Sequence, residues 1–191
     1  KKALQYYEKA AKQGSSLVNF VLAKSHETGR LGLKANAKKA QSYLEAADRL
    51  GSADAKIEIA EQLFAKRNAE SNQQALAKLA PLVQQGHVAA AYSQATFKIN
   101  DGFRQQNTAQ VQQGITELHA LGQKGHVASL LLLGNLYATG SLIKQDLNKA
   151  KIIFTALDQA KVAEAKPALE IVNQALAKQA QPANSKVAKK S

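Results

Sequence analysis

The chain has 191 residues, of which 45% are hydrophobic and 5% are aromatic. It has no Cys, which excludes a disulfide framework and a thiolate nucleophile, and it has no apolar run of 18 residues that could span a bilayer. The formal net charge is +12 at pH 7, and the excess lies in residues 1–50 and 151–191. This charge is consistent either with a polyanionic partner or with a lysine-rich solvated face that ends in a basic tail.

Glycines recur along the chain at intervals of 35 to 39 residues, each after an apolar-periodic stretch: Gly14, Gly51, Gly86 and Gly125. A period of this length is typical of a helical solenoid, in which each unit buries its apolar face against the next. The sequence therefore predicts an all-α superhelix of about four helix-turn-helix repeats with additional terminal helices. The composition agrees, because Ala, Leu, Lys and Gln dominate and favour helices.

The expected units run in order along the chain. Residues 1–14 are the second helix of an incomplete repeat, 15–51 and 52–86 are repeats, 87–125 is a divergent repeat, 126–160 is a repeat, 161–178 is a C-terminal capping helix, and 179–191 is a basic disordered tail. Because the chain opens inside a helical pattern without Met, we expect it to be a fragment of a longer protein.

The repeats 15–51 and 126–160 share the start of their second helix. Leu33, Asn36 and Ala40 match Ile143, Asp146 and Ala150 position for position. The Asn or Asp is expected to cap the new helix through its side-chain oxygen, and the small residue allows close helix approach.

The two middle repeats fit this pattern less well. In 52–86 we expect Ser71 to be the cap and Pro81 to bend the second helix. In 87–125 we expect a longer loop around residues 100–102, Gly114 in place of the usual Ala, and a cap at Asn107 or Thr108. In the last helix, Pro167 either introduces a kink or lies in the first turn.

These residues resemble the Sel-one-like repeat, a relative of the tetratricopeptide repeat. The family pattern A-x-x-x-L-G-x-x-Y-x-x-G is matched by Leu133, Gly134, Tyr137 and Gly140, and its V-x-x-D-x-x-K-A segment by Ile143, Asp146, Lys149 and Ala150. Its closing A-A-x-x-G is matched by Ala10, Ala11 and Gly14, whereas the next repeat has Asp48 in place of the second Ala and His26 in place of the Tyr. The resemblance covers about residues 1–165.

The resemblance implies a right-handed α-superhelix that acts as a protein–protein adaptor, with its first helices lining a concave face. Two sets of positions would then meet a partner. The first helices align on a small residue: Ala23, Ala60, Ala95 and Gly134. The residue directly after it is polar and differs between repeats, and the residue three positions before it is apolar. The polar set is Lys24, Glu61, Thr96 and Asn135, and the apolar set is Phe20, Ile57, Tyr92 and Leu131. Alternatively, the polar set is a solvated face and the apolar set packs neighbouring helices.

The sequence offers no catalytic constellation, phosphate-binding loop or cofactor motif, so we expect a chain that is not an enzyme and needs no cofactor or metal. His87 and His126 follow aligned glycines and are interpreted as junction residues, while His26 and His119 stand alone. Aromatic residues are too sparse to stack nucleic-acid bases.

The sequence thus predicts a non-enzymatic binding scaffold for a protein or peptide, and the most specific role expected from the resemblance is an accessory of a bacterial secretion or envelope assembly machine. The alternative is an envelope module that binds a polyanion such as an acidic polysaccharide or a cell-wall glycan. The family's tendencies favour a periplasmic or other extracytoplasmic location, with the cytoplasm as the alternative.

Overall fold

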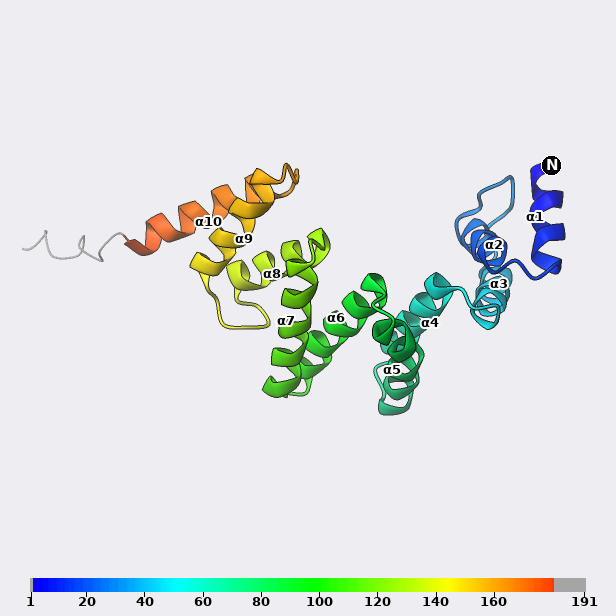
Figure 1. Cartoon of the computed structure of the whole chain (residues 1–191), viewed down its shortest axis with the longest axis horizontal. Helices are drawn as coiled ribbons and strands as arrows, with labels where there is room; N and C mark the ends of the chain where they lie inside the picture. Colours follow the sequence, from blue (N-terminus) through cyan, green and yellow to red (C-terminus); the bar gives the residue numbers. More distant parts are fainter. Residues whose placement is uncertain (1, 181–191) are drawn as a thin grey trace, which may run out of the picture. The chain divides into compact units, whose positions relative to one another are not determined.

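The computed structural model describes residues 2–180, which form ten α-helices and no strand (Figure 1). The chain divides into two compact units, Lys1–Gln94 and Ala95–Ser191, and each is described by itself. The predicted all-α fold built from helix pairs is confirmed. Within the described residues no helix is both long and apolar enough to cross a membrane.

The first unit contains five complete helices and the start of a sixth. These are α1 (Lys2–Lys12), α2 (Ser16–Thr28), α3 (Ala37–Arg49), α4 (Ala53–Ala65), α5 (Ala69–Gln84) and the beginning of α6 (Val88–Arg104). Helix α2 packs mainly on α3, and α4 packs mainly on α5, so consecutive helices form the predicted pairs.

The second unit begins within α6 and continues through four more helices. These are α7 (Thr108–Gln123), α8 (Val127–Thr139), α9 (Leu147–Gln159) and α10 (Ala165–Ala180). Helix α10 packs on α9, and Pro167 lies in its first turn, where a missing backbone N–H costs nothing. Helix α10 includes residues 179 and 180, and the rest of the predicted tail, 181–191, lies outside the described residues.

The recurring glycines each take a left-handed backbone conformation in the turn between two repeats. Their φ angles are +87° at Gly14, +93° at Gly51, +78° at Gly86 and +84° at Gly125. In each turn the next residue donates its backbone N–H to a carbonyl in the last turn of the preceding helix, as His126 does to Leu121. After α9 the same hydrogen bond runs from Val162 to Leu157, so Lys161, with φ +62°, occupies the glycine position.

The second helix of each repeat contributes the same two layers to the core. The reference position is the small residue near the start of each second helix: Ala40, Ala75, Gly114 and Ala150. One layer lies four residues after this position, and the other lies seven residues after it. Exposed fractions are 2% or less in the first layer, Leu44, Leu79, Leu118 and Phe154. They are 9% or less in the second, Ala47, Leu82, Leu121 and Leu157. The spacing of three and four residues places both layers on one helical face.

The first helices meet this core through their aligned small residues. Ala23, Ala60 and Ala95 are at most 3% exposed, and Gly134 is also buried. A Cβ atom added to Gly134 would lie 2.7 Å from the ring of Phe154, so α8 approaches α9 too closely for a larger residue.

The repeats come in two forms that differ in where the second helix begins. Helices α3 and α9 have 13 residues and follow long loops, whereas α5 and α7 have 16 residues and follow short turns. The caps are Asn36, Asn68, Asn107 and Asp146, and each accepts a hydrogen bond from the backbone N–H three residues later. The predicted caps Asn36 and Asp146 are confirmed, and Asn107 caps α7 in preference to Thr108.

Two expectations for the middle repeats are wrong. Ser71 is not the cap of α5, because its own backbone N–H donates to Asn68 Oδ1 at 2.8 Å. Residues 100–102 do not form a longer loop, because α6 continues to Arg104. In both repeats the second helix begins about one turn earlier than in repeats 15–51 and 126–160, and in 87–125 the first helix is longer as well.

Candidate functional site

The apolar residues proposed for the concave face are all half-buried. Phe20 packs against the core formed by Ala23, Leu44, Ala47 and Ala55, and Ile57 packs against the core around Leu79. Burial raises the pKa of Tyr92. Leu131 is half-buried on α8. At Phe20 and Ile57 the structure therefore shows the packing role that the sequence left open, although part of each side chain still reaches the surface.

The polar residues of the same helices lie further out. Glu61 and Asn135 are exposed, and Lys24 and Thr96 are half-buried. Each follows a buried small residue that holds its helix against the second helix, so the rotation of the first helix directs the polar side chain away from the core. The four residues belong to two separately described units, Lys24 and Glu61 to the first and Thr96 and Asn135 to the second.

Two of these polar residues also have contacts within the first unit. Lys24 forms ion pairs with Glu27 of its own helix and with Glu58 of α4, the latter at 3.2 Å. The hydrogen bond with Glu27, opposed by partial burial and supported by Glu58, raises the pKa of Lys24. Glu61 accepts a hydrogen bond from Ser93 Oγ at 3.2 Å. These contacts link neighbouring first helices and fix the directions of the two side chains.

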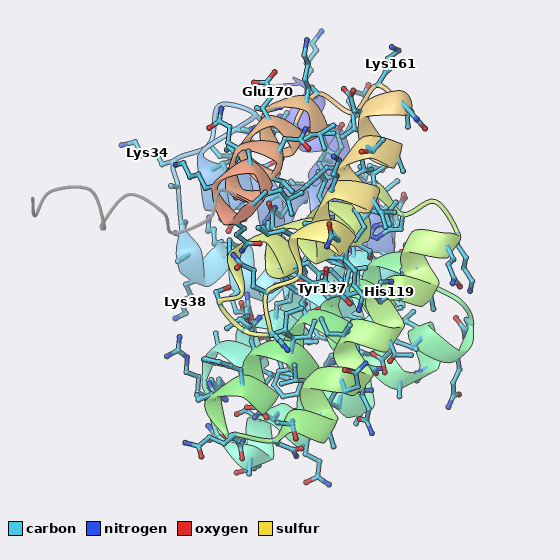
Figure 2. All side chains as sticks on the ribbon, turned by 90° about the vertical axis from the view of Figure 1, so that its left-hand side faces the viewer. Lys34, Lys38, His119, Tyr137, Lys161 and Glu170 are labelled. Carbon is cyan, nitrogen blue, oxygen red and sulfur yellow. The ribbon has the colours of Figure 1, made fainter. Side chains whose placement is uncertain are left out.

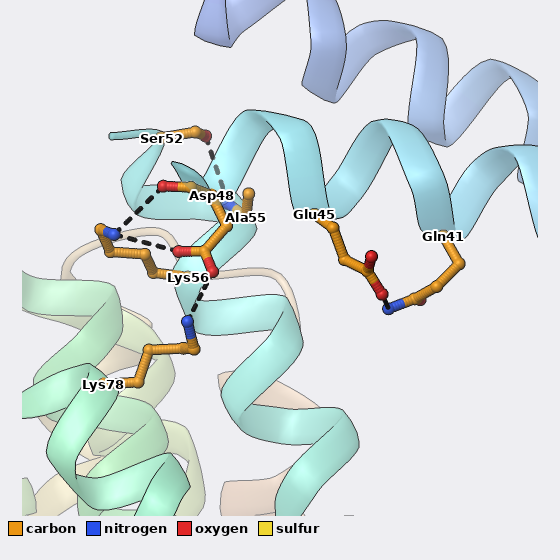
Figure 3. Close-up of polar contacts among 7 residues, drawn as sticks. All are labelled: Gln41, Glu45, Asp48, Ser52, Ala55, Lys56 and Lys78. Carbon is orange, nitrogen blue, oxygen red and sulfur yellow. Dashed lines mark hydrogen bonds and ion pairs between the residues drawn. The ribbon is translucent and has the colours of Figure 1, made fainter. Parts of the chain in front are cut away.

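A partly buried ion-pair network joins three helices of the first unit (Figure 3). Asp48 of α3 pairs with Lys56 of α4 at 3.0 Å and with Lys78 of α5. Burial alone would raise the pKa of Asp48, but the hydrogen bonds and charges of Lys78 and Lys56 outweigh it and hold this pKa below its usual value. The Asp that departs from the family's Ala is thus a link between successive helices.

His26 is buried rather than isolated. It is 5% exposed, its ring stacks on Tyr43 at a centroid distance of 5.5 Å, and its Nδ1 has no hydrogen-bond partner. Burial lowers the pKa of His26, and the charge of Lys39 lowers it further while Glu8 opposes. A neutral imidazole therefore stands where the family pattern has Tyr.

His119 belongs to a second aromatic contact, within the second unit. Its Nε2 lies 3.0 Å from the hydroxyl of Tyr137, and Figure 2 shows the two side chains next to each other. Lys149 Nζ lies 5.2 Å from the centre of the Tyr137 ring, at the upper range of a cation–π contact. Burial, with the charge of Lys149, lowers the pKa of His119. Sequence reasoning missed this contact because its members come from three helices.

The histidines at the junctions lie at the starts of α6 and α8, and in α8 His126 is the N-cap residue without a side-chain cap hydrogen bond. His87 Nδ1 accepts from the backbone N–H of Ala90 at 3.4 Å, and His126 Nδ1 lies 2.8 Å from Ser129 Oγ. Within residues 2–180 no group of three or more His, Cys, Asp or Glu side chains is placed to hold a metal ion. The arrangement offers packing and polar contacts along helices rather than a cluster of reactive groups.

The comparisons with known proteins agree with this architecture. The family model for the Sel1 repeat matches residues 1–15, 18–52 and 127–155. The two longer matches cover repeats with the long loop, and the middle repeats with the additional helical turn are not matched. No curated protein matched the chain.

Solved structures show the same fold over nearly the whole chain. A protective antigen present in uropathogenic Escherichia coli strains, which displays an SLR fold, is similar with a TM-score of 0.65 and 24% identity, over 93% of this chain and 38% of the antigen chain. A Sel1 repeat protein from Oxalobacter formigenes is similar with a TM-score of 0.64 and 18% identity, over 94% of this chain and 79% of that one. This chain thus spans less than half the length of the antigen. The chain thus contains Sel1 repeats at the matched residues, and it shares the fold of these two repeat proteins.

Proposed function

We propose that this chain is a non-enzymatic scaffold that holds a protein or peptide segment against the first helices of its repeats. The observation that carries the proposal is the contrast between two adjacent positions. The small residue of each first helix is buried in every repeat, while the next residue reaches the surface and changes from Lys24 to Glu61, Thr96 and Asn135. A position needed only for packing would keep its chemistry, whereas a recognition position can vary.

The family supports this proposal at a coarser level. Sel1-repeat proteins are generally protein-interaction scaffolds and bind protein partners, and their fold is typically not catalytic. The half-buried apolar set beside the polar set would add contact area, since Phe20, Ile57, Tyr92 and Leu131 keep part of their side chains accessible.

A photo-crosslinking scan in cells that produce the protein tests the surface. A photoreactive amino acid replaces Glu61 or Asn135 on the first helices, and matched controls replace Gln73 of α5 or Ile152 of α9, both of which are exposed. We expect protein adducts from the first-helix positions that are absent or much weaker at the control positions. Equal adducts from all four positions, or none from any, would contradict the proposal.

The alternative, a polyanion-binding module, has one specific observation in its favour. Residues 30–39 contain Arg30, Lys34, Lys38 and Lys39 and no acidic residue, and all four basic side chains are exposed. Figure 2 shows Lys34 and Lys38 extending outward from their ribbon. A strip of this kind attracts phosphate, carboxylate or sulfate groups without requiring a shaped pocket.

Salt dependence tests this alternative. If the strip binds heparin or alginate as model polyanions, affinity should fall steeply between low and physiological salt. The variant Lys34→Glu/Lys38→Glu should then lose binding, while Lys124→Gln/Lys166→Gln should retain most of it. Binding that changes neither with salt concentration nor in the Lys34→Glu/Lys38→Glu variant would contradict polyanion binding by residues 30–39.

We also propose that the protein works outside the cytoplasm, as an accessory of a bacterial secretion or envelope assembly machine. The support is indirect: a protective antigen shares the fold. Fractionation of the natural host, followed by immunodetection in periplasmic, membrane and cytoplasmic fractions, tests the location. Recovery only with the cytoplasmic fraction would contradict it.

A further inference from the structure

The second unit contains an open apolar groove that is separate from the polar set of first-helix residues. It has a volume of about 610 Å³ and lies between the end of α6, the first turns of α7 and the loop before α9. Its apolar lining includes Phe103, Val111, Leu142 and Ile143, and Phe103 remains 50% exposed. This volume falls in the range of roughly 300–1,000 Å³ that is usual for ligand sites.

The groove results from the meeting of the two repeat forms. Helix α6 has 17 residues, four more than α8, and its additional turn carries Gly102 and Phe103. The following repeat has the long loop, which brings residues 140–144 to the same place. Along the described chain, a repeat with a short turn is followed by one with a long loop only here, so the groove is particular to this junction.

A smaller, more polar pocket of about 320 Å³ continues the groove and shares Gln112, Ile143 and Lys144 with it. Its other side chains include Tyr137, Asp146 and Lys149. Asp146 is already engaged, because it caps α9 and pairs with Lys149 at 3.7 Å. The apolar groove itself is lined by no carboxylate, and Lys144 at the shared boundary is exposed. The charge available to an occupant is therefore positive.

We propose that this groove binds an acidic peptide segment of a partner protein, with an apolar side chain in the groove and a carboxylate directed toward Lys144. The proposal deepens the scaffold function on which it rests, because it names a second surface and the chemistry of its occupant. Charge disfavours the other occupants. A second copy would bring another +12, and residues 181–191 contain three Lys and no acidic residue.

A peptide fits the shape better than a small acid does. The apolar groove is open to solvent and leads directly into the polar pocket, so an extended segment can place successive side chains in the two parts. An alkyl acid in the same position would leave much of its chain exposed to water, which removes the gain from burial.

Four fluorescein-labelled decapeptides test the proposal on the full chain. One has a central Leu-Phe pair flanked by Glu, and the others replace the Glu residues by Lys, the Leu-Phe pair by Ser-Ser, or both. Fluorescence anisotropy should show saturable binding of the first peptide alone. Decanoate serves as a competitor and should displace it weakly. Binding of all four peptides, binding of none, or tighter binding of decanoate would overturn the proposal.

Variants then locate the binding site. Lys144→Glu and Phe103→Ser should each weaken the first peptide about tenfold or more, whereas Lys166→Glu, an equal charge change at the start of α10, should leave its affinity within about twofold. Thermal melting verifies that each variant is folded. Equal losses in Lys144→Glu and Lys166→Glu would show a nonspecific charge effect and overturn the groove.

Two further measurements separate this proposal from its rivals. Glu61→Lys/Asn135→Glu, which alters the first helices, should leave the peptide affinity unchanged; a loss there but not in Lys144→Glu would overturn the groove while retaining the scaffold function. Sedimentation of the chain without peptide should show no dimer that depends on Phe103, which means no dimer that the Phe103→Ser substitution would dissociate. Such a dimer, if the acidic peptide did not compete with it, would make a second copy the occupant and reject the acidic segment.

Discussion

At the scale of single residues, His26 and Tyr137 occupy one position in two repeats with different consequences. Each lies near the Lys that is three residues after the cap of the second helix: His26 is near Lys39, and Tyr137 is near Lys149. An aromatic ring attracts that charge, whereas a histidine near it is held neutral. The substitution of His for Tyr therefore replaces a favourable contact with a group that resists protonation.

This difference predicts a pH dependence of stability. Because the folded pKa values of His26 and His119 are lowered from 6.5, their contribution is fully present above about pH 6.5 and is lost as pH falls through the lower folded values. His26→Tyr should flatten this decline, and adding His119→Gln should flatten it further. Urea unfolding between pH 5 and 8 measures it. An unchanged pH slope in His26→Tyr would contradict the burial of a neutral imidazole.

A second prediction at this scale concerns Lys161, which occupies the glycine position of its turn with φ +62°. A side chain in this conformation costs about 1 kcal/mol. Lys161→Gly should therefore raise the free energy of unfolding by about 0.5–1 kcal/mol, and Gly125→Ala should lower it by a similar amount. Denaturant titration of both variants checks the pair. Destabilisation by Lys161→Gly would show that this turn differs from the others.

At the scale of helices, Asp48 ties α3 to α4 and α5 through Lys56 and Lys78. Asp48→Asn should lower the free energy of unfolding by about 1 kcal/mol at pH 7, because two partly buried ammonium groups lose their partner. Since the folded pKa of Asp48 is lowered, its contribution is present above its unfolded pKa and disappears as pH falls through the folded value. The variant and the natural chain should thus converge in stability at low pH.

Glu45→Gln is the matched control for this network. Glu45 lies on the same helix, is exposed and accepts a hydrogen bond from Gln41 Nε2 at 3.0 Å (Figure 3). Its substitution should change stability by less than about 0.5 kcal/mol. If Asp48→Asn were as mild as Glu45→Gln at neutral pH, the network would not contribute to holding the three helices together.

The cap of α7 tests how the middle repeats begin. Asn107 Oδ1 accepts from the backbone N–H of Gln110 at 3.1 Å, whereas Thr108 is already inside the helix. Asn107→Ala should cost about 1 kcal/mol, and the exposed Thr108→Ala should be close to neutral because Ala is the better helix former. Thermal unfolding compares the two variants. The reverse order would place the helix start one residue later.

At the scale of the whole molecule, short sequence patterns predicted the helical repeat. They did not predict the contacts that join one repeat to the next. The glycine turns, the caps Asn36 and Asp146 and the small residues at helix contacts each depend on a few neighbouring residues, so they could be identified in the sequence. The additional turn of α5 could not be identified in this way, because Asn68 and Ser71 are both residues that favour the N-cap position and only packing selects between them.

The sequence predicted where the candidate site residues lie on their helices, and their role in binding stays a prediction. The register placed Lys24, Glu61, Thr96 and Asn135 after buried small residues, as the structure has them. The pairing of Asp48 with Lys78 spans 30 residues, and the groove brings Phe103 to Leu142. Contacts at this separation depend on how successive helices stack, which no local pattern contains.

The most direct test of the central claim is the affinity of the natural partner, identified from the crosslinked adducts, for first-helix variants. We predict that Glu61→Lys/Asn135→Glu weakens binding by about tenfold or more with an unchanged melting temperature. The variant Gln73→Lys/Ile152→Glu, which alters the second helices α5 and α9, should stay within about twofold of the natural chain. Titration calorimetry with all three proteins decides the matter. Equal affinity in the natural chain and the first-helix variant would contradict the account.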